Sequence, residues 1–371
     1  MSLARLWAVS RKETIQLRRD PRSLMLAFLL PLVMLIIFGY AITFDVKDIH
    51  LAVLDRSQTE LSRALVQAFE SSGYFTVVEY LSRYEEATER LDGGRADIVV
   101  VLTPRFTHDL GAGRAPPVQI LLDGADANTA TIAQNYASVI VSRFAADRLA
   151  GSRKLVMPVE AASRVWYNET LESRNMIVPG LVAVIMSIIA SMLTALTMAR
   201  EWERGTMEQL AATPVHRLEV VFGKLVPYVA IGLFDVAIVA SAGVVIFDVP
   251  FRGSVLLLTL MTFLFLLGAL SLGLFISAAV KSQVLATQIA MIVTYLPALL
   301  LSGFMFSVAT MPVALRAVTY IVPARYYVTV TKGIFLKGVG MEVLWVEGLA
   351  MIVFATVSLA LALGSFRKEL G

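Results

Sequence analysis

The sequence predicts an α-helical polytopic membrane protein with six transmembrane helices and an α/β domain inserted between the first two. Three observations lead to this fold class. Hydrophobic residues make up 57% of the 371 residues and charged residues only 16%, whereas soluble domains are roughly 25% charged. Six long stretches are almost free of Asp, Glu, Lys and Arg. One long polar segment separates the first stretch from the second.

The uncharged stretches predict the membrane spans, because a helix needs about 20 apolar residues to cross a bilayer. A count of five or seven spans stays open, since 307–341 is also rather apolar. This segment contains two prolines, Pro312 and Pro323, and four basic residues. These residues favour short interfacial or re-entrant helices there. The first stretch is too long for a secretory signal, and no small-residue cleavage site follows it. The six spans are expected near residues 24–44, 176–199, 222–247, 254–279, 284–306 and 343–366.

Basic residues predict the orientation of these spans. Thirteen Lys and Arg residues fall in short segments on one side of the predicted membrane and five on the other, and the richer side is normally cytoplasmic. Both termini are therefore expected in the cytoplasm. The predicted parts are a cytoplasmic amphipathic segment (1–22), a first span (23–44), an extracytoplasmic α/β domain (45–174) and a five-helix core (175–371), which includes a charged cytoplasmic loop (200–219) and an external re-entrant segment (307–341).

Alternating strand and helix patterns in the polar segment predict a small α/β or α+β domain. Strands are expected at Ile49–Leu54, Phe75–Tyr80, Ala96–Leu102 and Val118–Leu122. Helices are expected at Ser57–Ser71, at Tyr84–Leu91, and from an N-cap at Asn128 to about Leu149.

Several classes of chemistry are excluded by what the sequence lacks. There is no cysteine, and the three histidines lie far apart, so no metal site is predicted. No Ser/His/Asp or Cys/His set suggests a catalytic residue. Gly223-Lys224 is followed by Leu225 rather than Ser or Thr, so the chain has no phosphate-binding loop of the usual kind. No cofactor and no nucleic-acid partner are expected, and any ATP hydrolysis is expected in another polypeptide.

The N-terminal segment predicts an amphipathic helix lying at the surface of anionic lipid. One face is expected to carry Leu3, Leu6, Trp7, Ser10, Thr14 and Leu17, and the opposite side Arg5, Lys12, Gln16 and Arg19. Whether this helix is a passive anchor or a lever on a cytoplasmic partner stays open.

Asp235 falls near the middle of the third predicted span, where an ionisable group costs roughly 2.5–3.5 kcal/mol. It is a candidate for the transport path, as a substrate or proton site. The alternative is a structural carboxylic acid hydrogen-bonded to its neighbours. Gly268, Gly273 and Gly303 are expected at close helix contacts.

A set of short motifs, in order along the whole chain, resembles the ABC-2 family of permeases, specifically the drug-exporter-like branch with a large external domain. The motifs are Lys12-Glu13, Arg19-Asp20-Pro21, Phe38-Gly39-Tyr40, Trp166-Tyr167-Asn168, Val178-Pro179-Gly180, Arg200-Glu201-Trp202-Glu203-Arg204-Gly205-Thr206, Gly223-Lys224-Leu225, Leu301-Ser302-Gly303-Phe304 and Ile321-Val322-Pro323-Ala324-Arg325-Tyr326.

The resemblance implies a six-helix permease subunit of an ATP-binding-cassette exporter, of the type V kind, in the inner membrane of a bacterial cell. Such a subunit pairs with a second permease and docks a cytoplasmic ATP-binding subunit that holds ATP and Mg²⁺. It also assigns residue roles: an ATPase-coupling helix, a connecting helix and an external re-entrant hairpin. In this chain these are Glu201, Glu203, Arg204, Gly205, Thr206, Glu208 and Leu210 for coupling; Leu6, Trp7, Lys12 and Glu13 for connecting; and Pro323, Arg325 and Tyr326 for the hairpin.

The same resemblance implies export of a hydrophobic or amphipathic substrate, drug-like or lipid-like, from the cytoplasm or inner leaflet. Relatives with the external domain often work with a periplasmic adaptor and an outer-membrane channel. Two other function classes stay open. One is an ion-coupled antiporter that uses Asp235, although no inverted repeat is visible. The other is a membrane receptor with an external sensing domain.

Overall fold

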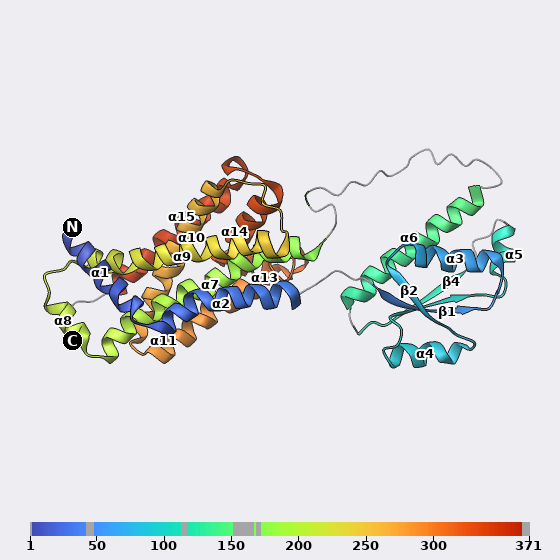
Figure 1. The fold of residues 1–371 in the computed structure, drawn as a ribbon, viewed down its shortest axis with the longest axis horizontal. Helices are drawn as coiled ribbons and strands as arrows, with labels where there is room; N and C mark the ends of the chain where they lie inside the picture. The colour runs from blue at the N-terminus through green and yellow to red at the C-terminus, as the bar shows by residue number, and fades with distance from the viewer. Residues whose placement is uncertain are drawn as a thin grey trace. The chain divides into compact units, whose positions relative to one another are not determined.

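The computed structural model describes residues 2–41, 48–112, 117–125, 127–150, 167 and 172–365. The chain divides into two compact units. One consists of Met1–Thr43 together with Val165–Gly371, and the other of Phe44–Arg164. Long helices make up the first unit, and a sheet with flanking helices makes up the second (Figure 1).

The helical unit contains five helices that are long and apolar enough to cross a membrane among the described residues, and a shorter apolar stretch at Ala27–Ala41. The protein is therefore mostly helical, as predicted. Its described elements are α1 (Leu3–Arg18), α2 (Pro21–Ala41), α7 (Ser173–Glu203), α8 (Thr206–Ala212), α9 (Arg217–Phe247), α10 (Val255–Val280), α11 (Gln283–Ala290), η1 (Met291–Tyr295), α12 (Leu296–Leu300), η2 (Val308–Thr310), α13 (Val313–Thr319), α14 (Pro323–Lys332), η3 (Gly333–Lys337) and α15 (Met341–Ser365).

α7 is the central helix of this unit. It packs against α2, α9, α10, α11 and α14, and it is apolar around most of its circumference, as a helix surrounded by other helices must be. Small residues let these helices approach closely. A Cβ on Gly273 of α10 would lie 2.3 Å from the carbonyl oxygen of Ser191, and one on Gly268 would overlap Phe354 of α15. The predicted packing role of these two glycines is confirmed.

The fifth predicted span, 284–306, is shorter than expected. It runs as α11, the π-helical turn η1 and α12, and it ends at Leu300. Ser302 then folds back onto Ala298 through its hydroxyl, and Gly303 adopts φ +80°. Gly303 is therefore a turn residue outside the helix, and its expected place at a helix contact within the span was wrong. Its conformation is one that residues with a side chain rarely adopt.

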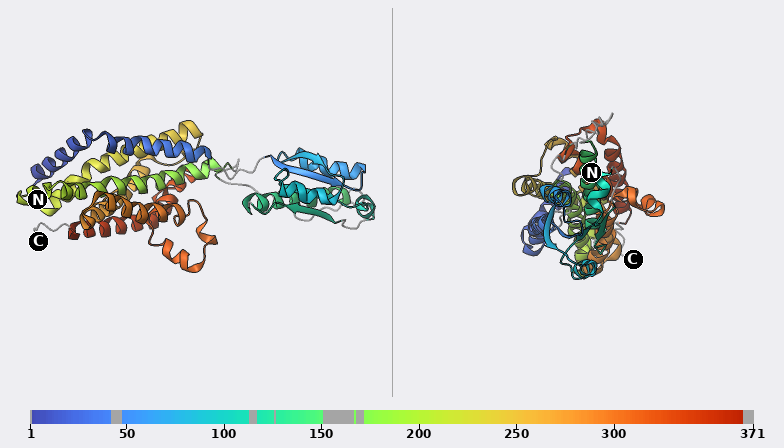
Figure 2. Two further views of the ribbon diagram at one scale, coloured as in Figure 1. Left: turned by 90° about the horizontal axis from the view of Figure 1, so that it is seen from below. Right: turned by 90° about the vertical axis from the view of Figure 1, so that its right-hand side faces the viewer.

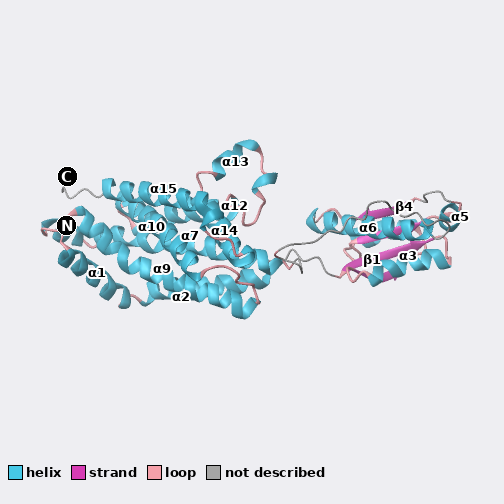
Figure 3. Cartoon of the chain, turned by 90° about the horizontal axis from the view of Figure 1, so that it is seen from above, coloured by secondary structure: helices cyan, strands magenta, loops and turns pink. Residues whose placement is uncertain are grey.

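The segment 307–341 forms the short helices that its prolines predict. η2, α13, α14 and η3 follow one another there, and Pro323 occupies the first turn of α14, where its missing N–H costs nothing. The part that contains α13 projects from the bundle (orange in Figure 2; labelled in Figure 3). α13 and α8 lie toward opposite ends of the helical unit (Figure 1).

The second unit is a four-stranded mixed sheet with strand order β2-β1-β3-β4. β1 pairs in parallel with β2 and β3, and β4 pairs antiparallel to β3. Its elements are β1 (Ile49–Asp55), α3 (Glu60–Ser71), β2 (Phe75–Tyr80), α4 (Tyr84–Asp92), β3 (Ile98–Leu102), α5 (Phe106–Gly111), β4 (Val118–Leu122) and α6 (Ala127–Ala150). Two strands match the predicted bounds fully. α6 begins at Ala127, so Asn128 lies inside the helix and is not its N-cap.

Both faces of this sheet are covered, which explains the continuous apolar run of β3. Leu51 and Val100 belong to one cluster that includes residues of α3, α5 and α6. Ala52 and Val99 belong to a second cluster with Ala87 of α4 on the other face. A strand buried on both sides cannot alternate polar and apolar residues. The unit is therefore a three-layer α/β domain.

Candidate functional site

A buried lysine joins three helices of the helical unit. Lys224 lies two turns into α9, and its side chain is only 2% exposed. Its Nζ is 2.6 Å from Oε1 of Glu13 in α1 and 3.0 Å from Oε1 of Glu201 in α7. Both carboxylates are themselves about 4% exposed. Three charges that are far apart in sequence therefore meet where α1, α7 and α9 converge.

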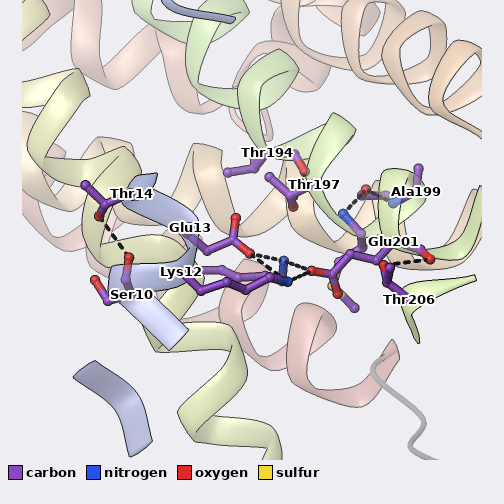
Figure 4. A network of polar contacts seen from close by, with 12 residues as sticks. Ser10, Lys12, Glu13, Thr14, Thr194, Thr197, Ala199, Glu201 and Thr206 are labelled. Carbon is purple, nitrogen blue, oxygen red and sulfur yellow. Dashed lines mark hydrogen bonds and ion pairs between the residues drawn. The ribbon is translucent and has the colours of Figure 1, made fainter. Parts of the chain in front are cut away.

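Lys12 completes this group, which we call the charge cluster: Lys12, Glu13, Glu201 and Lys224. The Nζ of Lys12 lies 2.5 Å from Oε1 of Glu201, and its side chain is about half exposed. Figure 4 shows Lys12 and Glu13 of α1 directed toward Glu201. Two ammonium groups balance two carboxylates, so the cluster is neutral overall. Such pairing is what permits ionised groups to be buried.

The position of Glu201 makes its pairing important. It lies in the last turn of α7, where the helix dipole disfavours a negative charge. Two lysines oppose that effect. Burying charges costs several kcal/mol per ion, so such a cluster adds little net stability compared with apolar packing. Loss of one of its buried members is nevertheless costly, because an unpaired charge stays behind. The cluster therefore acts mainly to hold α1, α7 and α9 in one arrangement.

α1 lies directly against α9 beside the cluster. A Cβ on Gly223 would be 2.7 Å from Cβ of Val9 and 3.1 Å from the carbonyl oxygen of Leu6, so only glycine fits at this crossing. The buried side of α1 consists of Val9, Ser10, Glu13 and Leu17.

This buried side differs from the apolar face that the sequence predicts. Leu3 is 80% and Trp7 65% exposed, while Glu13 is buried. The face is set by the contact with α9 and by the pairing of Glu13 with Lys224, neither of which a count of apolar residues along α1 can detect.

The start of α1 is tied to the connection between α8 and α9. The backbone N–H of Ser2 donates to Oε1 of Glu219 at 2.5 Å, and the other oxygen of Glu219 accepts from the N–H of His216 at 2.9 Å. Arg5 donates to the carbonyl oxygen of Pro214 at 2.5 Å. α1 is therefore attached to this connection at its beginning and to α7 and α9 at its middle.

The end of α7 is tied to two further helices. Arg200 forms an ion pair of 2.9 Å with Asp20, which directly precedes α2. Glu203 accepts hydrogen bonds from the backbone N–H of Gln283, at 2.8 Å, and from the side-chain amide of the same residue at the start of α11. Lys281 lies 4.3 Å above the ring of Trp202. Displacement of the end of α7 would therefore reach α2 and α11.

A sharp corner follows between α7 and α8. Gly205 has φ +67°, a left-handed conformation that suits a glycine after a helix. The hydroxyl of Thr206 donates to the carbonyl oxygen of Glu201 at 3.3 Å. Glu203 and Arg204 are exposed. The side chains of Glu208 and Leu210, also predicted for coupling, lie outside the described residues, although their backbone belongs to α8.

A cleft of about 920 Å³ lies beside the charge cluster and next to this corner. It is lined by residues of α1, the start of α2, the end of α7 and the start of α11. Four of the lining residues are basic and one is acidic. The basic residues are Lys12, Arg19, Arg200 and Arg204.

The remaining predicted residues lie elsewhere. Asp235 is on α9, eleven residues and hence about 16 Å beyond Lys224 along the helix axis. It is 1% exposed, and neither carboxylate oxygen has a hydrogen-bond partner among the described residues. Pro323 begins α14. The guanidinium of Arg325 donates to the hydroxyl of Thr319, and Tyr326 donates to the carbonyl oxygen of Tyr320 at 2.8 Å.

Sequence reasoning missed Lys224 and Glu219 as members of the site. Lys224 is one of the thirteen basic residues that predict the orientation, but its side chain is buried inside α9. One signal could have found Lys224: Val220, Val221 and Tyr228 lie three or four residues away from it, so the helix pattern places it on an apolar face.

The long apolar helices define a multi-span membrane protein. At one end of the bundle, the charge cluster joins α1, α7 and α9. Residues 21–363 match the model of the family described as ABC-2 family transporter protein, and the chain belongs to this family.

Curated relatives agree with this assignment. The chain is 36% identical to the probable multidrug ABC transporter permease YbhS of Escherichia coli over 363 residues, which cover 97% of this chain and 96% of the relative. It is 33% identical to YbhR of Escherichia coli K12, also a probable multidrug ABC transporter permease, over 98% of this chain and 99% of the relative. The linearmycin resistance permease protein LnrN of Bacillus subtilis is 21% identical over 98% of this chain. The protein is thus a permease component of an ABC transporter and a multi-pass inner-membrane protein.

Proposed function

We propose that this chain is the membrane-spanning subunit of an ATP-driven exporter. It moves a hydrophobic or amphipathic compound out of the cytoplasm or inner leaflet, while a separate ATP-binding subunit holds ATP and Mg²⁺ and hydrolyses the nucleotide. The observation that carries this proposal is the charge cluster, because it links the α7–α8 corner to α1 and α9. A force applied at the corner would then move three helices as one piece.

The proposed topology has six spans, with α2 as the first. Both termini and the loop 200–219, which contains the α7–α8 corner, lie in the cytoplasm. The sheet unit lies on the external side. Two facts support this arrangement: the basic residues concentrate near α1 and the corner, and α1 and α8 share one end of the helical unit (Figure 1). The exposed Leu3 and Trp7 would then enter the headgroup region, where amphipathic helices lie.

The coupling mechanism requires that the ATP-binding subunit make different contacts with the corner when ATP is bound and when it is absent. Arg204 and the backbone around Gly205 are exposed and would contact that subunit directly. Glu203 is exposed as well, and Gln283 holds its carboxylate in place. Glu201 faces inward to the two lysines, so it acts by positioning and does not touch the partner. Motion of α7 would pass to α11, whose span is largely exposed on this chain and which we place at the seam with a second permease. This motion would switch the path from inward- to outward-open.

The nature of the substrate is supported by an apolar cleft of about 420 Å³ in the helical unit. α7, α10, α12, α14 and α15 contribute to its walls, and its few polar groups are hydroxyls such as those of Ser187 and Ser191. Two relatives carry multidrug names and a third a linearmycin-resistance name, which agrees with a hydrophobic or amphipathic compound.

The proposed partners are an ATP-binding subunit and a second permease, with membrane lipid around them. The second permease is either an identical copy or a paralogue; Escherichia coli K12 has at least three permeases similar to this chain. A periplasmic adaptor and an outer-membrane channel complete the proposed export route.

The test is purification of the chain from its native cells, identification of the chains that co-purify, and transport by the complex in vesicles. Export that needs hydrolysable ATP supports the proposal. Transport that collapses with the ion gradient and ignores loss of the ATPase would instead identify an antiporter. Ligand binding to the 45–174 region without any flux would identify a receptor.

A further inference from the structure

A third cleft lies toward the α13–α14 end of the helical unit, away from the charge cluster. Its volume is about 610 Å³. Its walls come from the start of α7, the segment after α12, α14 with η3, and the start of α15. None of the residues that form the charge cluster or the corner contributes to it.

Basic side chains dominate the polar part of this cleft. Arg325 and Lys332 line it from α14, and Lys337 from η3, whereas Glu347 is the one acidic side chain among its described lining residues. Arg325 and Lys332 are seven residues apart, so they lie on the same face of α14. The cleft therefore has an excess of positive charge along one wall.

Lys332 is half-buried without a carboxylate partner. Its Nζ donates to the carbonyl oxygen of Gly303 at 3.2 Å, and no acidic group of the described residues lies within ion-pairing distance. An ammonium group has three donors, so one carbonyl leaves most of its capacity unused. Burial of a cation without an anion is unfavourable, and a bound anion would remove that cost.

A glycine of α7, Gly180, leaves room for the side chain of Lys332. A Cβ on Gly180 would lie 3.4 Å from Cε of Lys332 and 2.4 Å from the ring of Phe304. Glycine at this position thus lets the lysine stem and the phenyl ring lie against α7 together. Arg325 is held in place as well, since its guanidinium donates to Thr319 and lies 4.0 Å over the ring of Tyr320.

The rest of the cleft is mainly apolar, with Met176, Phe304, Met305, Val308 and Leu344 among its walls. A basic side next to an apolar side fits a molecule with an anionic head and a hydrophobic body, since the head gains charge-assisted hydrogen bonds and the body leaves water.

We propose that this cleft binds an anionic amphiphile, with its carboxylate or phosphate on Lys332 and Arg325 and its apolar body along Phe304 and Met176. This ligand is either an anionic phospholipid of the membrane or an exported compound. In the second case the inference rests on the proposed export function and specifies its substrate class.

The test uses the full-length chain in phosphatidylcholine nanodiscs and a photoactivatable fatty acid that carries a diazirine on its chain. After irradiation, labelled peptides are mapped by mass spectrometry. Saturable labelling is expected at 172–180 and 302–308, and the corresponding fatty alcohol is expected to label these peptides weakly. Lys332→Gln should raise the half-saturating probe concentration about tenfold or more, since it removes a charge-assisted hydrogen bond.

Two further variants control for folding and for charge in general. Lys332→Arg keeps the cation and should retain labelling. Arg316→Gln removes a positive charge from α13, where Arg316 contacts the carbonyls of Ala309 and Met311 and does not line the cleft, so labelling should be unchanged. Equal labelling by acid and alcohol, or wild-type labelling in Lys332→Gln, would overturn the proposal.

Competition separates the two sources of the ligand. Displacement of the probe by a few per cent of phosphatidylglycerol in the nanodisc identifies a membrane lipid. Displacement by laurate but not by phosphatidylglycerol identifies a soluble amphiphile of the exported kind. Because these measurements need neither nucleotide nor an ATP-binding subunit, their failure would leave the export proposal standing, and the failure of ATP-driven export would leave this site standing.

Discussion

Replacing Lys224 by methionine tests the charge cluster directly, because methionine keeps most of the side-chain volume and removes the ammonium group. Glu13 and Glu201 would then be buried with their main cation gone. At an effective dielectric constant of 20, the contacts of 2.6 and 3.0 Å each correspond to about 5–6 kcal/mol of Coulomb attraction. Desolvation offsets much of this, and loss of one partner from a buried pair typically costs about 3–5 kcal/mol.

The matched control removes the charges together. In the triple variant Lys224→Met with Glu13→Gln and Glu201→Gln, no ionised group is left unpaired inside, so most of the stability should return. Lys12→Gln should cost about 1 kcal/mol or less, because Lys12 is about half exposed and exposed pairs contribute little.

The assay is thermal unfolding of the purified chain in nanodiscs, followed by tryptophan fluorescence. The expected order of stability is wild type, then Lys12→Gln and the triple variant, with Lys224→Met clearly lowest. If Lys224→Met were as stable as the wild type, or if the triple variant were no better than Lys224→Met, the three charges would not form the buried cluster described here.

Three further outcomes are expected. Glu203→Lys with Gly205→Pro should abolish ATPase stimulation and export but leave membrane insertion intact. Proline cannot adopt φ +67° at position 205, and the carboxylate contact of residue 203 with Gln283 would be lost. Export at the wild-type rate in a strain without paralogous pumps would disprove the coupling role. Asp235→Leu should stabilise the chain by about 1–3 kcal/mol, measured as a higher unfolding temperature, because it replaces a buried carboxyl that has no hydrogen-bond partner among the described residues. Unchanged efflux by Asp235→Asn across several pH values would make this residue purely structural. Leu51→Ala in the sheet unit should cost about 2–5 kcal/mol, as for other fully buried leucines, whereas Val78→Ala, at a site 45% exposed, should change stability by about 0.5 kcal/mol or less. Equal effects of the last two, measured by urea unfolding of the sheet unit in the full chain, would contradict the packing of β1.

Local patterns in the sequence determined where most elements lie. The bounds of β2 and β4 and most of the long helices follow from uninterrupted apolar runs and strand-like alternation, because a bilayer or a covered sheet face imposes its pattern on consecutive residues. The short helices at 307–341 follow from Pro312 and Pro323. The shortened fifth span does not, since it depends on a turn at Gly303 that packing against Val308 and α14 completes.

Only the tertiary structure decided which charges are buried and which are free. Lys224 is 211 residues from Glu13 and 23 from Glu201. Both glutamates follow a basic residue in the sequence, Lys12 and Arg200, so nothing in the local pattern selects Lys224 as their partner. Their pairing requires α1 to fold back onto α9 at Gly223, and this contact also sets which face of α1 is buried. Helical periodicity is a property of neighbouring residues, whereas the partner of a buried charge is chosen by the way distant helices pack.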